Sequence, residues 1–262
     1  MKSTLLYVLN GLFAGLARLR TLFPSSHYAL LATFFFVGLE LTFNLRLWGA
    51  LLLLLVLLIL TVGIILIRSE EGGDFHITQT ILPIFSAIGF TGFALFLPNA
   101  NYLHAYFLLA SFLMYFVLRY GSKKAFPNWN WTVSFFVLFT LLATILGWRF
   151  HLFIPVMLVL SLVFVSFTLM SLQSLARIVP HSSESWLLAL VIGFVLTQVA
   201  WALLFMPLHF LVSAGVLVAL YYVIFHLLSL SYEKKLTKQD IVEYIVLGAI
   251  SLFVLLFTAR WI

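Results

Sequence analysis

The sequence contains nine apolar segments, each about as long as the hydrocarbon core of a membrane is thick. They cover approximately residues 27–43, 46–67, 77–97, 102–119, 131–148, 152–173, 186–205, 208–230 and 241–259. A transmembrane helix needs roughly 17 to 25 predominantly apolar residues, and this chain is 64% hydrophobic and 8% charged. A soluble core cannot bury that much apolar side chain. The sequence therefore predicts an all-α fold, a polytopic transmembrane helical bundle of about nine spans.

The first 24 residues differ from these spans because their large apolar side chains share a single helical face. That face carries Leu5, Leu9, Leu12, Leu16, Leu19 and Phe23. Such a helix lies in the membrane interface, and Pro24 would end it. We predict an N-terminal amphipathic interfacial helix over 1–24 and a single transmembrane helical bundle over 25–262. A cleaved signal peptide is the alternative, because Gly15-Leu16-Ala17 resembles a cleavage site, but Arg18 and Arg20 directly after it argue against export.

Positive charge alternates along the chain, and this alternation predicts the orientation of the spans. Eleven of the 14 Lys and Arg residues fall on the side of the N-terminus: Lys2, Arg18, Arg20, Arg68, Arg119, Lys123, Lys124, Arg177, Lys234, Lys235 and Lys238. The opposite side keeps Arg46, Arg149 and Arg260. Cytoplasmic loops accumulate Lys and Arg, so we expect an integral protein of a plasma or inner membrane. Its N-terminus would be cytoplasmic and its C-terminus outside.

The same charge distribution indicates which partners the protein meets. The net charge is +6, but nucleic-acid binding requires basic residues clustered on one folded face. Here they lie at the ends of apolar segments, where they would meet anionic headgroups of the lipid bilayer at the inner face. We therefore expect the bilayer as the partner and no nucleic acid.

No motif in the sequence specifies a reaction or a cofactor. Cysteine is absent, which excludes disulfides and thiolate chemistry. The sequence has no GxSxG elbow, HExxH pair or Walker loop. His104, His151 and His209 are expected at the outer face, where three histidines could bind zinc, but their spacing does not require it. We therefore predict no cofactor and no metal.

Glu40 is the one acidic residue expected at membrane depth, in the outer third of the first span. Ionisable groups in this position are costly and therefore become functional candidates. The favoured interpretation is a carboxylate that reaches the outer interface and pairs with Arg46. The alternative is a proton-coupling or cation-binding carboxylate facing the bundle interior.

The most unusual stretch runs from Gln198 to His209, where polar and aromatic residues recur every three or four positions. Gln198, Trp201 and His209, with Phe205, would share one helical stripe, and Pro207 would break the helix. The favoured interpretation is a glutamine that hydrogen-bonds neighbouring helices and fixes their packing. The alternative is a site in the outer half of the bundle, lined by these residues and by Tyr221 or Tyr222.

Three classes of function remain. Transport or handling of a small molecule or lipid comes first, because the third and seventh spans contain residues that allow kinks and the loops are short. This class predicts a polar cavity lined by those two spans. A non-catalytic membrane scaffold or assembly protein is the alternative. An intramembrane enzyme is third, and it would require Glu40 or the outer histidines to lie within about 3–4 Å of one another.

Overall fold

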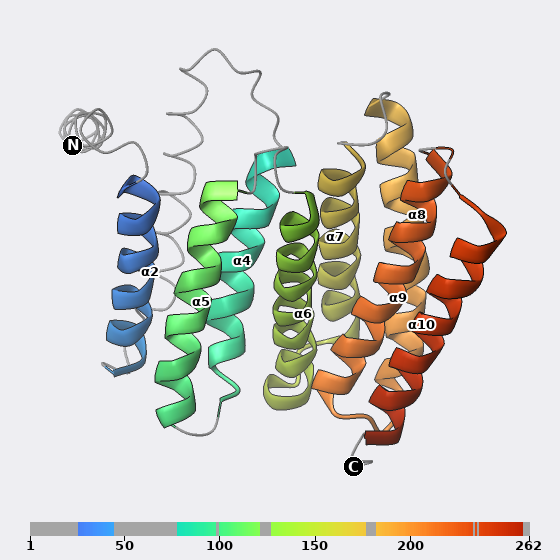
Figure 1. The fold of residues 1–262 in the computed structure, drawn as a ribbon. Helices are drawn as coiled ribbons and strands as arrows, with labels where there is room; N and C mark the ends of the chain where they lie inside the picture. Colours follow the sequence, from blue (N-terminus) through green and yellow to red (C-terminus); the bar gives the residue numbers. More distant parts are fainter. Residues whose placement is uncertain are drawn as a thin grey trace. The chain divides into compact units, whose positions relative to one another are not determined.

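The computed structural model describes residues 26–44, 78–97, 100–120, 127–176, 182–232, 234 and 236–258. In these residues the chain is helical and contains no strand. The helices are α2 (Ser26–Asn44), α4 (Thr78–Ala94), α5 (Ala100–Tyr120), α6 (Pro127–Leu152), α7 (Val156–Leu175), α8 (Ser182–Leu204), α9 (Phe210–Tyr232) and α10 (Lys238–Thr258) (Figure 1). The expected interfacial helix over 1–24 and the expected span over 46–67 lie outside the described residues.

Six of the described helices, α5 to α10, are long and apolar enough to cross a membrane. Shorter apolar helical stretches cover Leu31–Phe43 in α2 and Ile81–Ala94 in α4. These helices indicate a membrane protein, and the all-helical architecture predicted from the sequence is confirmed for the described residues. Each of the eight expected segments that falls in them forms one helix.

The boundary between α6 and α7 differs from its expected position. A turn was expected over 149–151, but α6 continues to Leu152 and the turn covers 153–155. Pro155 disfavours helical backbone in the residue before it. Phe153 adopts a left-handed conformation with φ 53°, and an Arg149 guanidinium N–H donates to the Ile154 carbonyl oxygen at 3.3 Å. The residues of the turn, and not the end of the apolar segment, therefore determine where α6 ends.

The chain divides into two compact units, Met1–Val133 and Ser134–Ile262, and the division falls inside α6. In the first unit α2 and α4 both pack on α5. Aromatic rings join these helices, as in the Phe43–Phe107 pair with centroids 5.2 Å apart. The buried Tyr106 hydroxyl donates to the Phe90 carbonyl oxygen at 2.9 Å, which ties α5 to α4.

Helix α4 remains continuous although Pro83 lies inside it. The buried Ser86 hydroxyl donates to the Pro83 carbonyl oxygen at 2.8 Å and lies 3.2 Å from the Met114 sulfur of α5. Gly89 and Gly92 are buried, as expected where backbones approach closely. The expected third span is therefore a closely packed helix and is not interrupted.

In the second unit α7 packs on α8 along a face of small residues. Ala189, Gly193 and Ala200 of α8 are buried. A Cβ atom at Gly193 would overlap the Thr168 hydroxyl oxygen and would lie 3.3 Å from the Phe164 carbonyl oxygen. Glycine is thus required here by close approach of the two backbones.

Helix α9 contacts both α8 and α10. The attachment of α10 is narrow, because Gly248 is the single buried residue among those of α10 whose burial is described. A Cβ atom at Gly248 would lie 2.5 Å from Val223 Cγ2 of α9. One glycine therefore sets how closely α10 approaches the rest of the unit.

Candidate functional site

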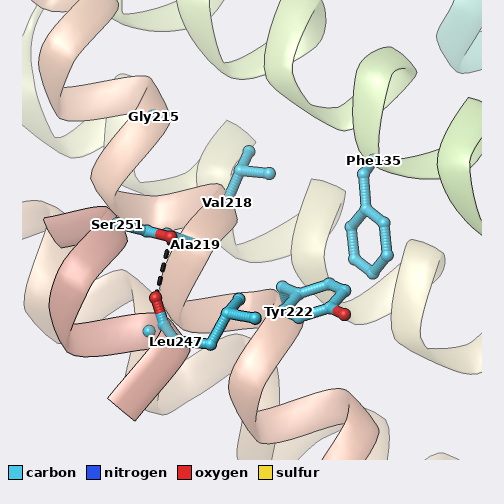
Figure 2. Close-up of a pocket in the computed structure, with 8 residues that line it drawn as sticks. Phe135, Gly215, Val218, Ala219, Tyr222, Leu247 and Ser251 are labelled. Carbon is cyan, nitrogen blue, oxygen red and sulfur yellow. Dashed lines mark hydrogen bonds between the residues drawn. The ribbon is translucent and has the colours of Figure 1, made fainter. Parts of the chain in front are cut away.

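A groove with a cavity volume of about 250 Å³ lies among α6, α9 and α10 in the second unit (Figure 2). Its lining residues are Phe135 from α6, Gly215, Val218, Ala219 and Tyr222 from α9, and Leu247, Gly248 and Ser251 from α10. Most of them are partly exposed. The groove is therefore open to the surface of the unit.

The groove exists because α9 and α10 carry small residues where the two helices approach each other closely. Gly248 touches Val223, and a Cβ atom at Gly215 would lie 3.2 Å from Leu255 Cδ2. Gly215 and Ala219 are one turn apart on α9, which is the spacing of small residues at membrane helix interfaces. These short side chains bring the backbones together but do not fill the space beside Phe135.

The chemistry of the groove walls is apolar. Among the lining residues only Tyr222 and Ser251 carry polar side chains. The Ser251 hydroxyl donates to the Leu247 carbonyl oxygen of its own helix at 2.8 Å, which leaves it a weak anchor for any ligand (Figure 2). No lining residue carries a charge at neutral pH.

Stacked aromatic rings occupy the Tyr222 end of the groove. The ring centroids of Tyr222 and His226 are 4.3 Å apart, and the His226 ring stacks on Tyr244 of α10 at 5.3 Å. Phe135 meets Tyr222 edge to face at 5.1 Å. These rings therefore pack directly on one another beside Tyr222 and leave no space for a cation between their faces.

Glu40 has a partner on another helix of the first unit. Its Oε1 atom lies 2.7 Å from Nδ1 of His104 on α5. The Glu40 side chain is 22% exposed and that of His104 is 50% exposed. An ionised carboxylate only accepts hydrogen bonds, so the imidazole donates. The expected partner of Glu40, Arg46, lies outside the described residues.

Gln198 and Trp201 are exposed on α8, contrary to the expectation that the Gln198 amide packs against neighbouring helices. They belong to the bulky face of α8, with Val191, Phe194 and Val195. The opposite face carries Ala189, Gly193 and Ala200 and is the one that meets α7. Close packing of the small face thus turns Gln198 outward.

His209 occupies the turn between α8 and α9, where Pro207 interrupts the helix as expected. Its Nδ1 atom accepts a hydrogen bond from the Leu211 backbone N–H at 3.3 Å. The rings of His209 and His151 both pack on Phe210, with centroids 4.4 Å and 5.6 Å away. Partial burial, and then the nearby His151, lower the pKa of His209.

The four candidate residues are divided between the two units. Glu40 belongs to the first unit and the other three to the second. No hydrogen bond in the described part of the chain links Gln198, Trp201 and His209 to one another. Tyr221 lies about 16 Å along α9 from Phe210, at ~1.5 Å per residue, and so is remote from His209. Among the described residues no three His, Asp or Glu side chains gather into a possible metal site.

The sequence interpretation missed a set of buried polar side chains on α7. Thr168, Ser171, Gln173 and Ser174 are all buried. The sequence contained a signal for them, because these four polar residues fall within two turns near the end of α7. Tyr221 of α9 lies beside Ser171 and Ser174, a contact that depends on the pairing of α7 with α9.

Comparison with known proteins gives a family match for the C-terminal part of the chain. No curated protein and no solved structure matches it. The sequence pattern of one family matches residues 124–258, more than half of the 262 residues. The matched segment includes α6 to α10 and therefore the groove, whereas Glu40 and His104 lie outside it. The chain belongs to the family described as Protein of unknown function (DUF5656).

Proposed function

We propose that the protein handles or transports a lipid or another small apolar molecule, and that the groove among α6, α9 and α10 receives it. The groove itself is the observation that supports this proposal, although it is apolar and formed by α6, α9 and α10 and is not the polar cavity expected between the third and seventh spans. Its volume of about 250 Å³ is just below the roughly 300–1,000 Å³ of drug-sized ligand pockets. A segment of an acyl chain or a small apolar molecule suits that size.

The walls of the groove support an apolar ligand over a charged one. A charged group placed among uncharged side chains would lose its hydration without a compensating partner. The lining of the groove offers only the Tyr222 hydroxyl and the already bonded Ser251 hydroxyl. The matched family segment contains the whole groove, which makes it the favoured site over the Glu40–His104 pair.

A photoreactive phospholipid with a diazirine in its acyl chain tests this proposal. In proteoliposomes it should label peptides from α9 and α10, identified by mass spectrometry. Ala219→Leu fills the groove and should remove most of that labelling. Ala249→Leu makes the same change at an exposed position of α10 and should retain it. Equal labelling of both variants and of the parent protein would exclude the groove as a lipid site.

The orientation in the membrane is part of the same proposal. We place the N-terminus in the cytoplasm and the C-terminus outside, in a plasma or inner membrane, with the basic helix ends against anionic headgroups. The charge alternation supports this orientation. A phosphatase reporter fused to the C-terminus should be active and one fused at Lys124 silent. The reverse pattern would overturn the orientation.

An intramembrane enzyme is the second candidate, and the Glu40–His104 contact favours it. At 2.7 Å the carboxylate can orient the imidazole as a general base. Lipid extracts of proteoliposomes containing the parent protein or Glu40→Gln would reveal a product that depends on Glu40. If neither lipid labelling in the groove nor such a product is found, the remaining alternative is a scaffold or assembly protein.

A further inference from the structure

The hydroxyl groups of α7 differ in whether they form a hydrogen bond within their own helix. Ser161 and Ser166 donate to the carbonyl oxygens of Met157 and Leu162, four residues earlier, at 2.8 Å and 2.7 Å. This is the common arrangement for serine in a membrane helix. Ser171 departs from it, because its buried hydroxyl has no hydrogen-bond partner among the described residues. Its hydroxyl is thus available to a group outside its own helix.

The Ser171 hydroxyl lies beside a second unpartnered hydroxyl, that of Tyr221 on α9. Ser171 and Ser174 both lie within reach of a hydrogen bond to the Tyr221 hydroxyl. However, neither Ser171 Oγ nor Tyr221 Oη has a hydrogen bond of normal geometry to a described protein atom. Ser171 is 0% exposed and Tyr221 is 2% exposed. Two buried hydroxyls therefore lie near one another without a hydrogen bond of normal geometry.

Apolar rings enclose this region. The Tyr221 ring has Phe135, Phe167 and Phe225 around it, with ring centroids 5.7–5.8 Å away. Inside a membrane an unsatisfied hydroxyl is expensive, because lipid supplies no replacement partner. Buried polar groups in proteins are normally satisfied, by water where no protein group is available.

We propose that Ser171, Ser174 and Tyr221 form a binding site for one uncharged hydroxyl-bearing group, either a water molecule or the hydroxyl of an alcohol. Hydroxyls both donate and accept hydrogen bonds, so such a ligand can bridge Ser171 and Tyr221. No charged side chain belongs to the site, so the ligand is neutral. Phe135 touches Tyr221 and also lines the groove, so the site borders the groove. It does not depend on a lipid occupying the groove.

Two substitutions and their combination test the site by thermal unfolding of the full-length protein in detergent. Ser171→Ala and Tyr221→Phe should each lower Tm by about 2–4 °C, the size expected when a chain of this length loses one net hydrogen bond. The double variant should lose less than the sum, because both residues hold the same ligand. Ser166→Ala is the control, since its hydroxyl bonds within α7 and its effect should add independently to that of Tyr221→Phe.

The sign of the single effects separates an occupied site from an empty one. A truly unsatisfied hydroxyl destabilises the fold, so its removal would leave Tm unchanged or raise it. Unchanged or raised Tm values, or strictly additive losses, would overturn the proposal.

A second measurement identifies the ligand. If it is water, infrared spectra in H₂¹⁸O should show an isotope-sensitive O–H band that disappears in Tyr221→Phe. If it is an alcohol, 1-hexanol should raise the Tm of the parent protein but not of Tyr221→Phe, and hexane should not reproduce the effect. Coupling between the two residues without either signal would indicate a direct bond between their hydroxyls and would overturn the proposal.

Discussion

Glu40 Oε1 and His104 Nδ1 lie 2.7 Å apart and join α2 to α5, although the two residues are 64 positions apart in the sequence. The pair is reinforced by neighbouring rings, since Phe107 contacts both His104 and Phe43. This contact links the two helices through polar side chains. It therefore gives the first unit a measurable interhelical interaction.

We predict that Glu40→Gln and His104→Ala are energetically coupled. A half-exposed polar contact of this kind contributes about 0.2–1 kcal/mol, and the double variant should lose less stability than the sum of the single variants by that amount. Unfolding in detergent measures it. Tyr102→Phe is the control, because it removes an exposed hydroxyl from α5, the helix that carries His104. Its effect on stability should be additive with that of Glu40→Gln. Additivity of Glu40→Gln with His104→Ala would show that the contact contributes no stability.

Acidification should destabilise the second unit through His209. Because partial burial and His151 lower the pKa of His209 in the folded protein, the unfolded chain binds a proton more readily, near its usual pKa of about 6.5. The contribution to stability is therefore complete above about pH 6.5 and is lost as the pH falls through the lowered folded pKa.

Tm measured at a series of pH values between about 7.5 and 5 checks this prediction. His209→Gln should flatten the decrease below pH 6.5, and His151→Gln should reduce it in part by removing the repulsion. An identical pH profile for His209→Gln and the parent protein would contradict the prediction.

Gly193→Ala should destabilise the contact between α7 and α8. The added Cβ would overlap the Thr168 hydroxyl, and overpacking of this kind typically costs about 1–3 kcal/mol. Adding Thr168→Ala should restore part of the loss, while the Phe164 carbonyl oxygen 3.3 Å away limits the recovery. Gly215→Ala should be milder, because it meets the flexible end of Leu255. Equal stability of Gly193→Ala and the parent protein would rule out this close packing.

Cysteines introduced at Val223 and Gly248 should form a disulfide between α9 and α10. The Cβ position of residue 248 lies 3.8 Å from Val223 Cβ, which is the usual separation across a disulfide, about 3.8 Å. The chain has no cysteine of its own, so labelling with a maleimide reports the bond directly. The control pair is Val223→Cys with Ala249→Cys, in which residue 249 lies on a different side of α10. Its two cysteines should stay reduced and be fully labelled. Full labelling of both pairs would place α10 elsewhere.

The helices could be predicted from the sequence because length and apolarity alone decide whether a segment can cross a bilayer. Boundaries were less predictable where turn chemistry acts, as at Leu152, where α6 runs past the end of its apolar segment. The break at Pro207 was predictable because proline removes a backbone donor.

The candidate site could be predicted only in part, because polarity does not reveal which face of a membrane helix is inside. Lipid is as apolar as a leucine side chain, so small residues decide the packing. Gln198 was conspicuous as a glutamine, yet the glycine and alanine face of α8 took the interior. Ser171 and Tyr221 were missed because their proximity depends on which helices are neighbours, and no sequence spacing encodes that.

The single glycine that holds α10 against α9 has a consequence for how the protein responds to its lipid environment. A helix attached along so narrow a face can change its tilt with little loss of buried area. Tilt is the usual adjustment of a helix to a change in hydrocarbon thickness. Because α10 forms one wall of the groove, we expect the width of the groove, and hence its affinity for an apolar ligand, to vary with bilayer thickness.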